Sequence, residues 1–184
     1  GDAVINLGKL SRVWQAGIDY SNSLRPESLV RGLYERLIDN SNAKSPDVYG
    51  HGTHVASVAA GRSFRAPDTT GIAPGASVYD VKVLDDDGNG QLADILAGLD
   101  WVIFHAKEYG IRVINLSVAS DSTESYLTDP LCRAVRAASA AGLTVVVSAG
   151  NFGRNAMGTE VFGSIASPAN DPTVISVGSA NTKA

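Results

Sequence analysis

From residue 50 onward, apolar positions recur along the chain with two alternating patterns. Between Ala93 and Tyr109 they recur at helical spacing, and Gly110 follows as a stop signal. Short continuous apolar runs separate the helical stretches, and such runs are typical of buried strands. The pattern therefore predicts helices over about 51–61, 93–109 and 129–141, and strands over 77–84, 113–116, 143–147 and 173–177.

This alternation predicts an α/β fold in which helices flank a mostly parallel β-sheet. The first fifty residues are less regular, and their pattern favours only a strand over 12–20 and a short helix over 26–38. No internal repeat, low-complexity tract or linker interrupts the sequence. We therefore expect residues 1–184 to form one unit.

The composition narrows the class of protein. With 184 residues, 44% of them hydrophobic and 18% charged, the chain is long enough to bury a globular core. Its net charge of −4, with mixed signs, argues against nucleic acid as a partner, and no basic block or long apolar stretch indicates a membrane. The single cysteine, Cys132, excludes an internal disulfide and is predicted to be a small buried helix residue.

A histidine between two glycines, His51, stands where the helix predicted over 51–61 begins. An imidazole accepts and releases a proton near neutral pH, and the glycines leave it approachable. Taken alone, however, such a histidine is more often a solvated loop residue. The small residues that follow predict a closely packed helix. We interpret His54 as a packed structural histidine, because no other ligand at metal spacing accompanies it, and His105 as a surface residue.

Four sequence blocks resemble, in this order, the signature blocks of the subtilisin-like serine proteases, the subtilase or peptidase S8 family. They are His-Gly-Thr-His-Val-Ala at 51–56, Gly-Ile-Ala-Pro-Gly-Ala at 71–76, Val-Ile-Asn-Leu-Ser at 113–117 and Ser-Ala-Gly-Asn at 148–151. The resemblance covers about residues 49–178. It implies a subtilisin-like, doubly wound α/β fold, here incomplete, and a parent protein that hydrolyses proteins with an Asp/His/Ser triad.

The resemblance also implies roles for individual residues. His51 would be the general base, and Asn151 would donate a side-chain N–H to the oxyanion. An extended polypeptide substrate would pair with backbone on both sides of a cleft. The substrate-binding residues implied are Gly88, Asn89, Gly90 and Leu92 on one side, Ser117, Val118 and Ala119 on the other, and Ser148, Ala149, Gly150 and Phe152 around a pocket that prefers apolar side chains.

Two family motifs are absent. No Asp-Ser-Gly or Asp-Thr-Gly precedes His51, and Asp19, followed by Tyr-Ser-Asn, is a weak candidate for the triad acid. No Gly-Thr-Ser nucleophile motif occurs, since residues 158–160 read Gly-Thr-Glu. We therefore expect an internal part of a longer catalytic domain that is inactive by itself. Ala119, where the family usually has glycine, puts a methyl group at the substrate edge.

Other readings of the sequence stay open as alternatives. The first is a catalytically inactive family member that binds peptides without cleaving them. A more remote one is a dinucleotide-binding domain, because residues 88–93 fit the glycine fingerprint, although three aspartates precede them and Asn115 replaces the expected acidic residue. Residues 85–96 match half an EF-hand, but Leu96 replaces its glutamate, which leaves only a weaker calcium site open. No cofactor or oligomeric state is indicated, and secretion is a family expectation.

Overall fold

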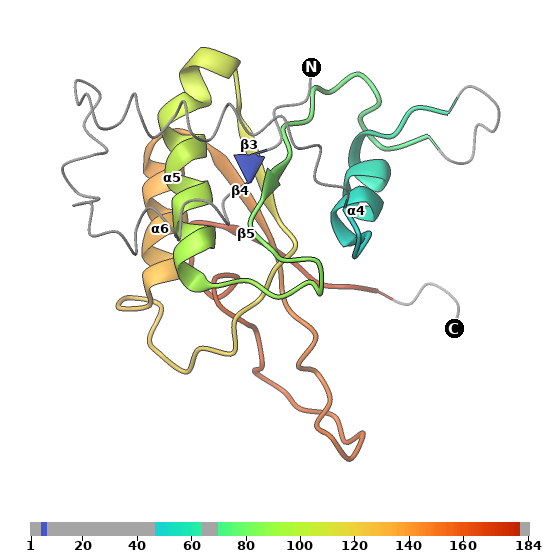
Figure 1. Ribbon diagram of the computed structural model, residues 1–184. Coiled ribbons are helices and arrows are strands. Elements are labelled where there is room, and N and C mark those ends of the chain that lie inside the picture. Colours follow the sequence, from blue (N-terminus) through green and yellow to red (C-terminus); the bar gives the residue numbers. More distant parts are fainter. Residues whose placement is uncertain (1–4, 7–46, 64–69, 181–184) are drawn as a thin grey trace. The chain divides into compact units, whose positions relative to one another are not determined.

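The computed structural model describes residues 5–6, 47–63 and 70–180 (Figure 1). The strand and helix predicted over 12–20 and 26–38 lie outside the described residues. The chain divides into two compact units, residues 1–98 and 99–184, with the boundary inside helix α5. Within the described ranges, no helix has both the length and the apolarity that crossing a membrane requires.

The first unit contains helix α4 (His51–Ala60) and a two-stranded parallel sheet of β1 (Ile5–Asn6) and β2 (Val81–Lys82). Helix α4 confirms the helix predicted from residue 51. The strand predicted over 77–84 was too long. Only Val81 and Lys82 form a strand, because among the described residues only the two residues of β1 pair with this run. The remaining residues of this apolar run form irregular backbone on either side of the pair.

Helix α4 differs from the prediction in how it packs. None of its side chains is fully buried, and the side chain of His54 is exposed, so the interpretation of His54 as a packed histidine is wrong. The close contact involves backbone instead. The N–H groups of Ile72 and Ala73 donate to the carbonyl oxygens of Val58 and Ala59 at 3.0 and 2.8 Å. The second sequence block thus lies against the last turn of the helix.

Helix α5 (Leu92–Tyr109) confirms the longest predicted helix, and Gly110, at φ 67°, follows its end. The prediction that His105 is a surface residue was wrong, since this residue is only 6% exposed. Its ring lies tilted beside that of Trp101 and stacks on that of Tyr109, with centroids 4.5 and 5.4 Å away. Its Nδ1 lies 2.9 Å from Glu108 Oε2. Residues four apart share a helix face, so the two aromatic neighbours cover the imidazole.

The second unit contains a three-stranded parallel sheet with the order β3-β4-β5. The strands are β3 (Val113–Leu116), β4 (Thr144–Ser148) and β5 (Ile175–Val177). Leu116 pairs with Val147 in the register of the first two strands, and Ser148 pairs with Val177 in that of the last two. These strands lie within about two residues of their predicted bounds, and they confirm an α/β fold with parallel strands.

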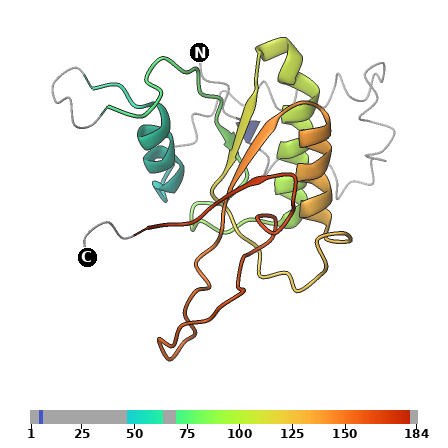
Figure 2. The same ribbon diagram turned by 180° about the vertical axis from the view of Figure 1, so that it is seen from behind.

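Helix α6 (Pro130–Ala140) packs against β4 and forms the core of this unit (Figures 1 and 2). Asp129 caps it by accepting the N–H of Cys132 at 2.9 Å, and Pro130 occupies the first turn, where no backbone donor is needed. As predicted, Cys132 is fully buried, and burial raises the pKa of its thiol. The core side chains of helix and sheet are Ile114, Leu116, Leu131, Cys132, Val135, Ala138, Val145 and Val147.

Candidate functional site

The first candidate residue, His51, is the first residue of helix α4 and is exposed to solvent. Gly50 precedes it as the N-cap with φ 82°, a left-handed conformation that glycine adopts without strain. The chain therefore turns sharply just before the histidine. This turn places the imidazole at the positive end of the helix dipole, on an accessible surface of the first unit.

A carboxylate that the sequence analysis missed, Asp47, holds this turn in place. Gly50 offers no side chain for capping, and the Asp47 carboxylate accepts hydrogen bonds in its place. Its Oδ1 accepts the Gly50 N–H at 2.9 Å, and its Oδ2 accepts the Thr53 N–H at 2.7 Å. The hydrogen bonds from Thr53, followed by that from Gly50, hold the pKa of Asp47 below its ordinary value. The available signal was an acidic residue just ahead of a helix that lacks its own side-chain cap.

The ring of Tyr49 links the histidine to the predicted substrate loop within the first unit. Its centroid lies 6.5 Å from that of His51, and a Cβ added to Gly88 would come within 2.7 Å of its ring carbons. Gly88 also has φ 78°. Only glycine combines this backbone conformation with so close an approach, so the structure brings His51, Tyr49 and Gly88 into one neighbourhood.

The loop that contains Gly88, Asn89 and Gly90 is closed upon itself. Asp85 Oδ1 accepts the N–H groups of Asp87 and Asn89 at 3.0 and 2.8 Å, and the Gly88 N–H donates to the Asp85 carbonyl at 3.1 Å. A dinucleotide phosphate would need such N–H groups, and the neighbouring carboxylates repel it. The loop geometry thus disfavours the nucleotide alternative. Leu92, which begins α5, is 43% exposed.

In the second unit, two predicted substrate segments leave the same edge of the parallel sheet. Ser117, Val118 and Ala119 follow β3, while Ser148 ends β4 and Ala149 and Gly150 follow it. Because Leu116 pairs with Val147, both segments begin at the carboxyl ends of adjacent strands. This is the edge at which α/β folds place their ligands. The register therefore brings these segments side by side.

Beyond β4, the backbone makes a close turn before Asn151. Gly150 has φ 90°, and a Cβ added there would lie 2.8 Å from the Cβ of Ala166. The side chain of Asn151 is exposed, and Phe152 is 44% exposed. The turn thus presents an amide to solvent just past the sheet edge, with an aromatic ring beside it.

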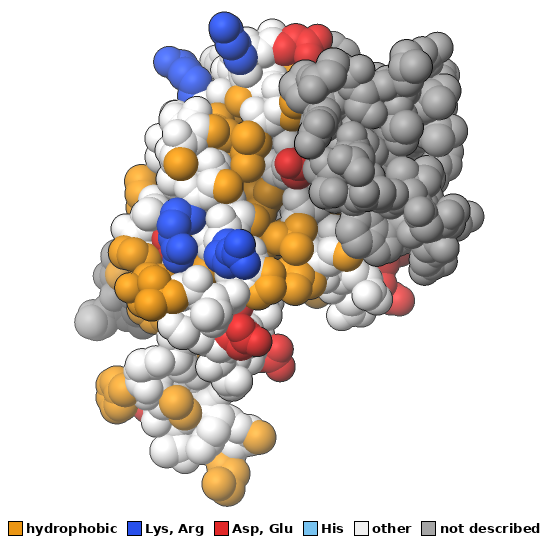
Figure 3. Space-filling view, turned by 90° about the vertical axis from the view of Figure 1, so that its left-hand side faces the viewer, with side chains coloured by type: hydrophobic (Ala, Val, Ile, Leu, Met, Phe, Trp, Pro, Cys, Tyr) orange, Lys and Arg blue, Asp and Glu red, His pale blue; other side chains and the backbone are white. Residues whose placement is uncertain are grey.

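Residues 153–161 form an arm that extends from this turn (Figure 2). The Asn155 side chain closes its tip by accepting the N–H groups of Met157 and Thr159 at 3.0 and 2.9 Å, and the Val161 N–H donates to the Gly153 carbonyl. Apolar side chains project from the arm, seen in orange at the bottom of Figure 3. Met157 and the adjoining Phe162 are each 88% exposed. The sequence pattern predicted no helix or strand for this segment.

The predicted site residues therefore fall into two groups. His51 lies in the first unit with Gly88, Asn89, Gly90 and Leu92, and Asn151 lies in the second with the two sheet-edge segments and Phe152. Asp19, the candidate for the triad acid, lies outside the described residues. Among residues 47–63 and 70–180, no cluster of three His, Cys, Asp or Glu side chains is arranged to hold a metal ion.

Comparison with known proteins places the chain in a family. The sequence pattern of the subtilase family matches residues 18–184, which extends the likeness upstream of the four blocks. Subtilisin-like protease 5 of Arthroderma benhamiae is 35% identical over 176 residues, which cover 96% of this chain and 39% of that protein. The chain belongs to the subtilase family.

Other relatives agree with this assignment. Serine protease AprX of Bacillus subtilis is 37% identical over 145 residues, covering 76% of this chain and 31% of that protein. Subtilisin-like protease 3 of Pseudogymnoascus destructans is 37% identical over 139 residues, which cover 73% of this chain and 30% of that protein. The chain thus spans no more than 39% of the length of these relatives.

Proposed function

We propose that this chain is part of the catalytic domain of a serine endopeptidase. The observation that carries the proposal is the match to the subtilase family over residues 18–184, a match that includes the blocks of His51 and Asn151. Relatives similar to this chain are named as serine and subtilisin-like proteases. The substrate is a polypeptide, which the full-length protein hydrolyses by acyl transfer.

In this proposal His51 is the general base. A serine hydroxyl attacks the carbonyl carbon of the scissile peptide bond while the imidazole takes its proton, and the imidazole then returns that proton to the leaving amine. The carbonyl oxygen gains the negative charge, which the side-chain N–H of Asn151 stabilises. The exposure of both side chains supports these roles. The serine and its acidic partner are not among the motifs of these 184 residues.

The substrate lies extended in a cleft between backbone segments. The segments that follow β3 and β4 support this proposal, because each leaves the carboxyl edge of the sheet with irregular backbone. An added peptide strand can pair with backbone of this kind. Phe152 and Leu92, 44% and 43% exposed, supply apolar surface for side chains of the substrate. The specificity is thus for apolar or aromatic residues.

The test uses point variants of the full-length protein and an unfolded protein substrate. His51→Ala lowers kcat by about 10⁶-fold, because base and nucleophile act as a unit. Asn151→Ala lowers kcat by about 10²–10³-fold with little change in KM, because its hydrogen bond strengthens in the transition state. Asn155→Ala, which removes an exposed amide that only closes the tip of the arm, leaves kcat near the wild-type value.

The same assay separates the proposal from an inactive peptide-binding protein. A fluorophosphonate probe that labels an activated serine would mark the wild type and not the His51→Ala variant. If the wild type binds extended peptides but neither cleaves them nor takes up the probe, the alternative is correct. Full activity in His51→Ala would show that the base is another residue.

A further inference from the structure

The irregular segment 166–171 of the second unit is unusual because all of it except Asn170 is buried. Ala166, Ser167, Ala169 and Asp171 are each no more than 6% exposed. Irregular backbone normally lies at the surface, since buried N–H and C=O groups need partners. The partners of this segment therefore show what it holds in place.

The backbone of this segment hydrogen-bonds beside or within the two predicted substrate segments of the second unit, which are the cleft flank Ser117–Ala119 and the pocket flank Ser148–Gly150. The Ser120 N–H donates to the Ser167 carbonyl at 2.9 Å, directly after the flank of Ser117–Ala119. The Ala166 N–H donates to the Ala149 carbonyl at 3.0 Å, in the middle of the other flank. Adjacent residues of one buried segment thus hydrogen-bond to Ser120, directly after one side of the predicted cleft, and to Ala149, in the wall of the predicted pocket.

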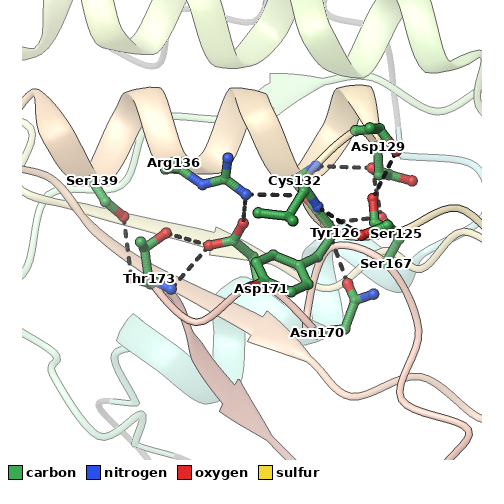
Figure 4. A network of polar contacts seen from close by, with 12 residues as sticks. Ser125, Tyr126, Asp129, Cys132, Arg136, Ser139, Ser167, Asn170, Asp171 and Thr173 are labelled. Carbon is green, nitrogen blue, oxygen red and sulfur yellow. Dashed lines mark hydrogen bonds and ion pairs between the residues drawn. The ribbon is translucent and has the colours of Figure 1, made fainter.

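The side chain of Ser167 ties the segment to helix α6 (Figure 4). Its hydroxyl donates to Asp129 Oδ1 at 2.9 Å, and the same oxygen accepts the Cys132 N–H at 2.9 Å. Asp129 and Ser167 are 3% and 2% exposed. Burial raises the pKa of Asp129. The hydrogen bonds from Cys132, Ser122 and Ser167 lower it by a larger amount, so the pKa lies below its ordinary value.

A second tie lies farther along the helix. Arg136 Nη2 donates to Asp171 Oδ2 at 2.6 Å, and Asp171 Oδ1 accepts from the backbone N–H and hydroxyl of Thr173. Burial raises the pKa of Asp171, and the bonds from Thr173 and Arg136 lower it more. Ties at positions 129 and 136 are about 10 Å apart along a helix, so the segment cannot pivot about either one.

We propose that Ser167 is a positioning residue that sets the spacing between the two substrate flanks through its hydrogen bond to Asp129. The proposal rests on the proposed function, in which an extended polypeptide pairs with the cleft flank and places a side chain in the pocket. Helix α6 packs on β4 and supplies the rigid reference. Without the hydroxyl, Ser120 and Ala149 keep their backbone partners, but the segment that joins them loses its tie to the start of the helix.

The test measures kinetics of the full-length Ser167→Ala variant on two substrates. For a long peptide that reaches both flanks, KM rises about tenfold while kcat stays within about twofold, because ground-state positioning is lost. For a short amide that reaches only the pocket around Ser148–Gly150, KM changes much less. Equal rises for both substrates, or no rise, would overturn the proposal.

Matched variants separate positioning from stability. Ser139→Ala removes a hydroxyl that donates from the same helix to the Thr173 carbonyl at 3.2 Å, away from both flanks. It leaves the ratio of the two KM values unchanged even where it lowers the melting temperature. Asp129→Asn keeps an acceptor oxygen for Ser167 and for the helix cap, so its KM ratio stays near that of the wild type. An altered ratio in Ser139→Ala would contradict the positioning role.

A binding measurement keeps this proposal distinct from the proposed function. In a His51→Ala background, calorimetry with the long peptide reports affinity without cleavage. Ser167→Ala weakens that affinity about tenfold, as it does KM. If Ser167→Ala weakens peptide binding but the wild type does not cleave the peptide, the peptidase proposal is refuted and the positioning role is retained. Cleavage by the wild type with unchanged binding in Ser167→Ala would do the reverse.

Discussion

At the scale of single residues, Asp47 shows how one carboxylate can order a candidate catalytic group. It accepts two backbone N–H groups around His51, those of Gly50 and Thr53, and so replaces the side-chain cap that Gly50 lacks. The bonds favour its charged form, which is why the pKa of Asp47 is lowered. The turn that presents His51 therefore depends on the ionisation of Asp47.

We predict that Asp47→Ala destabilises the protein by about 1 kcal/mol at pH 7, the usual cost of a lost helix cap. A folded-state pKa below the unfolded value gives stability that is present above about pH 4 and is lost as pH falls through the folded value. The difference between variant and wild type therefore shrinks in acid. Urea unfolding at pH 7 and near pH 3 measures it.

The control for this prediction is Asp121→Ala, which removes an exposed carboxylate from the segment after β3. Its free energy of unfolding stays within about 0.5 kcal/mol of the wild type at both pH values, as for most surface substitutions. A cost of Asp47→Ala that is the same at both pH values would show that the charge of Asp47 does not act through the cap.

Single residues also mark the limit of prediction from the sequence. His51 and Asn151 could be proposed as site residues because they lie within blocks that resemble signature blocks of the family. Tyr49 could not, since its contact depends on how the turn before α4 folds back on Gly88. An acidic residue ahead of the helix was a signal for Asp47, but it did not show which N–H groups the carboxylate accepts. His105 was misplaced because helical position alone does not show that Trp101 and Tyr109 cover its ring.

At the scale of elements, the packing of the second sequence block on α4 explains a glycine. A Cβ added to Gly71 would lie 2.5 Å from the Gly61 nitrogen and 2.8 Å from both the Ala60 nitrogen and the Ser57 carbonyl oxygen. All three atoms belong to backbone, which cannot move aside as a side chain can. Gly71 is thus the point at which the loop touches the end of the helix.

We predict that Gly71→Ala destabilises the protein by about 1–3 kcal/mol, the usual range for overpacking. Gly75→Ala is the matched control, because no atom lies within 4 Å of a Cβ added there, and its effect stays within about 0.5 kcal/mol. Thermal unfolding of the two variants gives the comparison. Equal effects would mean that the loop does not approach the helix so closely.

The elements of the second unit were the most predictable. Helix α6 has Asp129 and Pro130 at its start and Gly142, at φ 89°, shortly after its end, and these signals are local in sequence. Strand β2 was overestimated because its extent depends on the neighbouring strand β1, which is remote in sequence. The burial of segment 166–171 could not be predicted for the same reason, since its partners come from three separate stretches of chain.

At the scale of the whole molecule, helix α4 and the described elements of the second unit differ in how much they bury. The second unit has a core shared by α6 and the sheet, including Val135, Val145 and Val147 at no more than 1% exposed, whereas α4 in the first unit has no fully buried side chain. Backbone hydrogen bonds open more readily where few apolar contacts hold them. The helix that presents His51 should therefore open independently of the core.

Hydrogen exchange read by mass spectrometry tests this difference. We predict that amides of β4 and α6 exchange more slowly than those of α4 by about two orders of magnitude or more, because opening free energies range from near zero to the global value. Under the proposed function, binding of an extended peptide next to His51 slows exchange in α4 more than in α6, since α6 is already ordered by its core. Uniform protection in the free protein would mean that α4 opens only when the whole molecule unfolds, and that the order around His51 is supplied by global stability and not by Asp47.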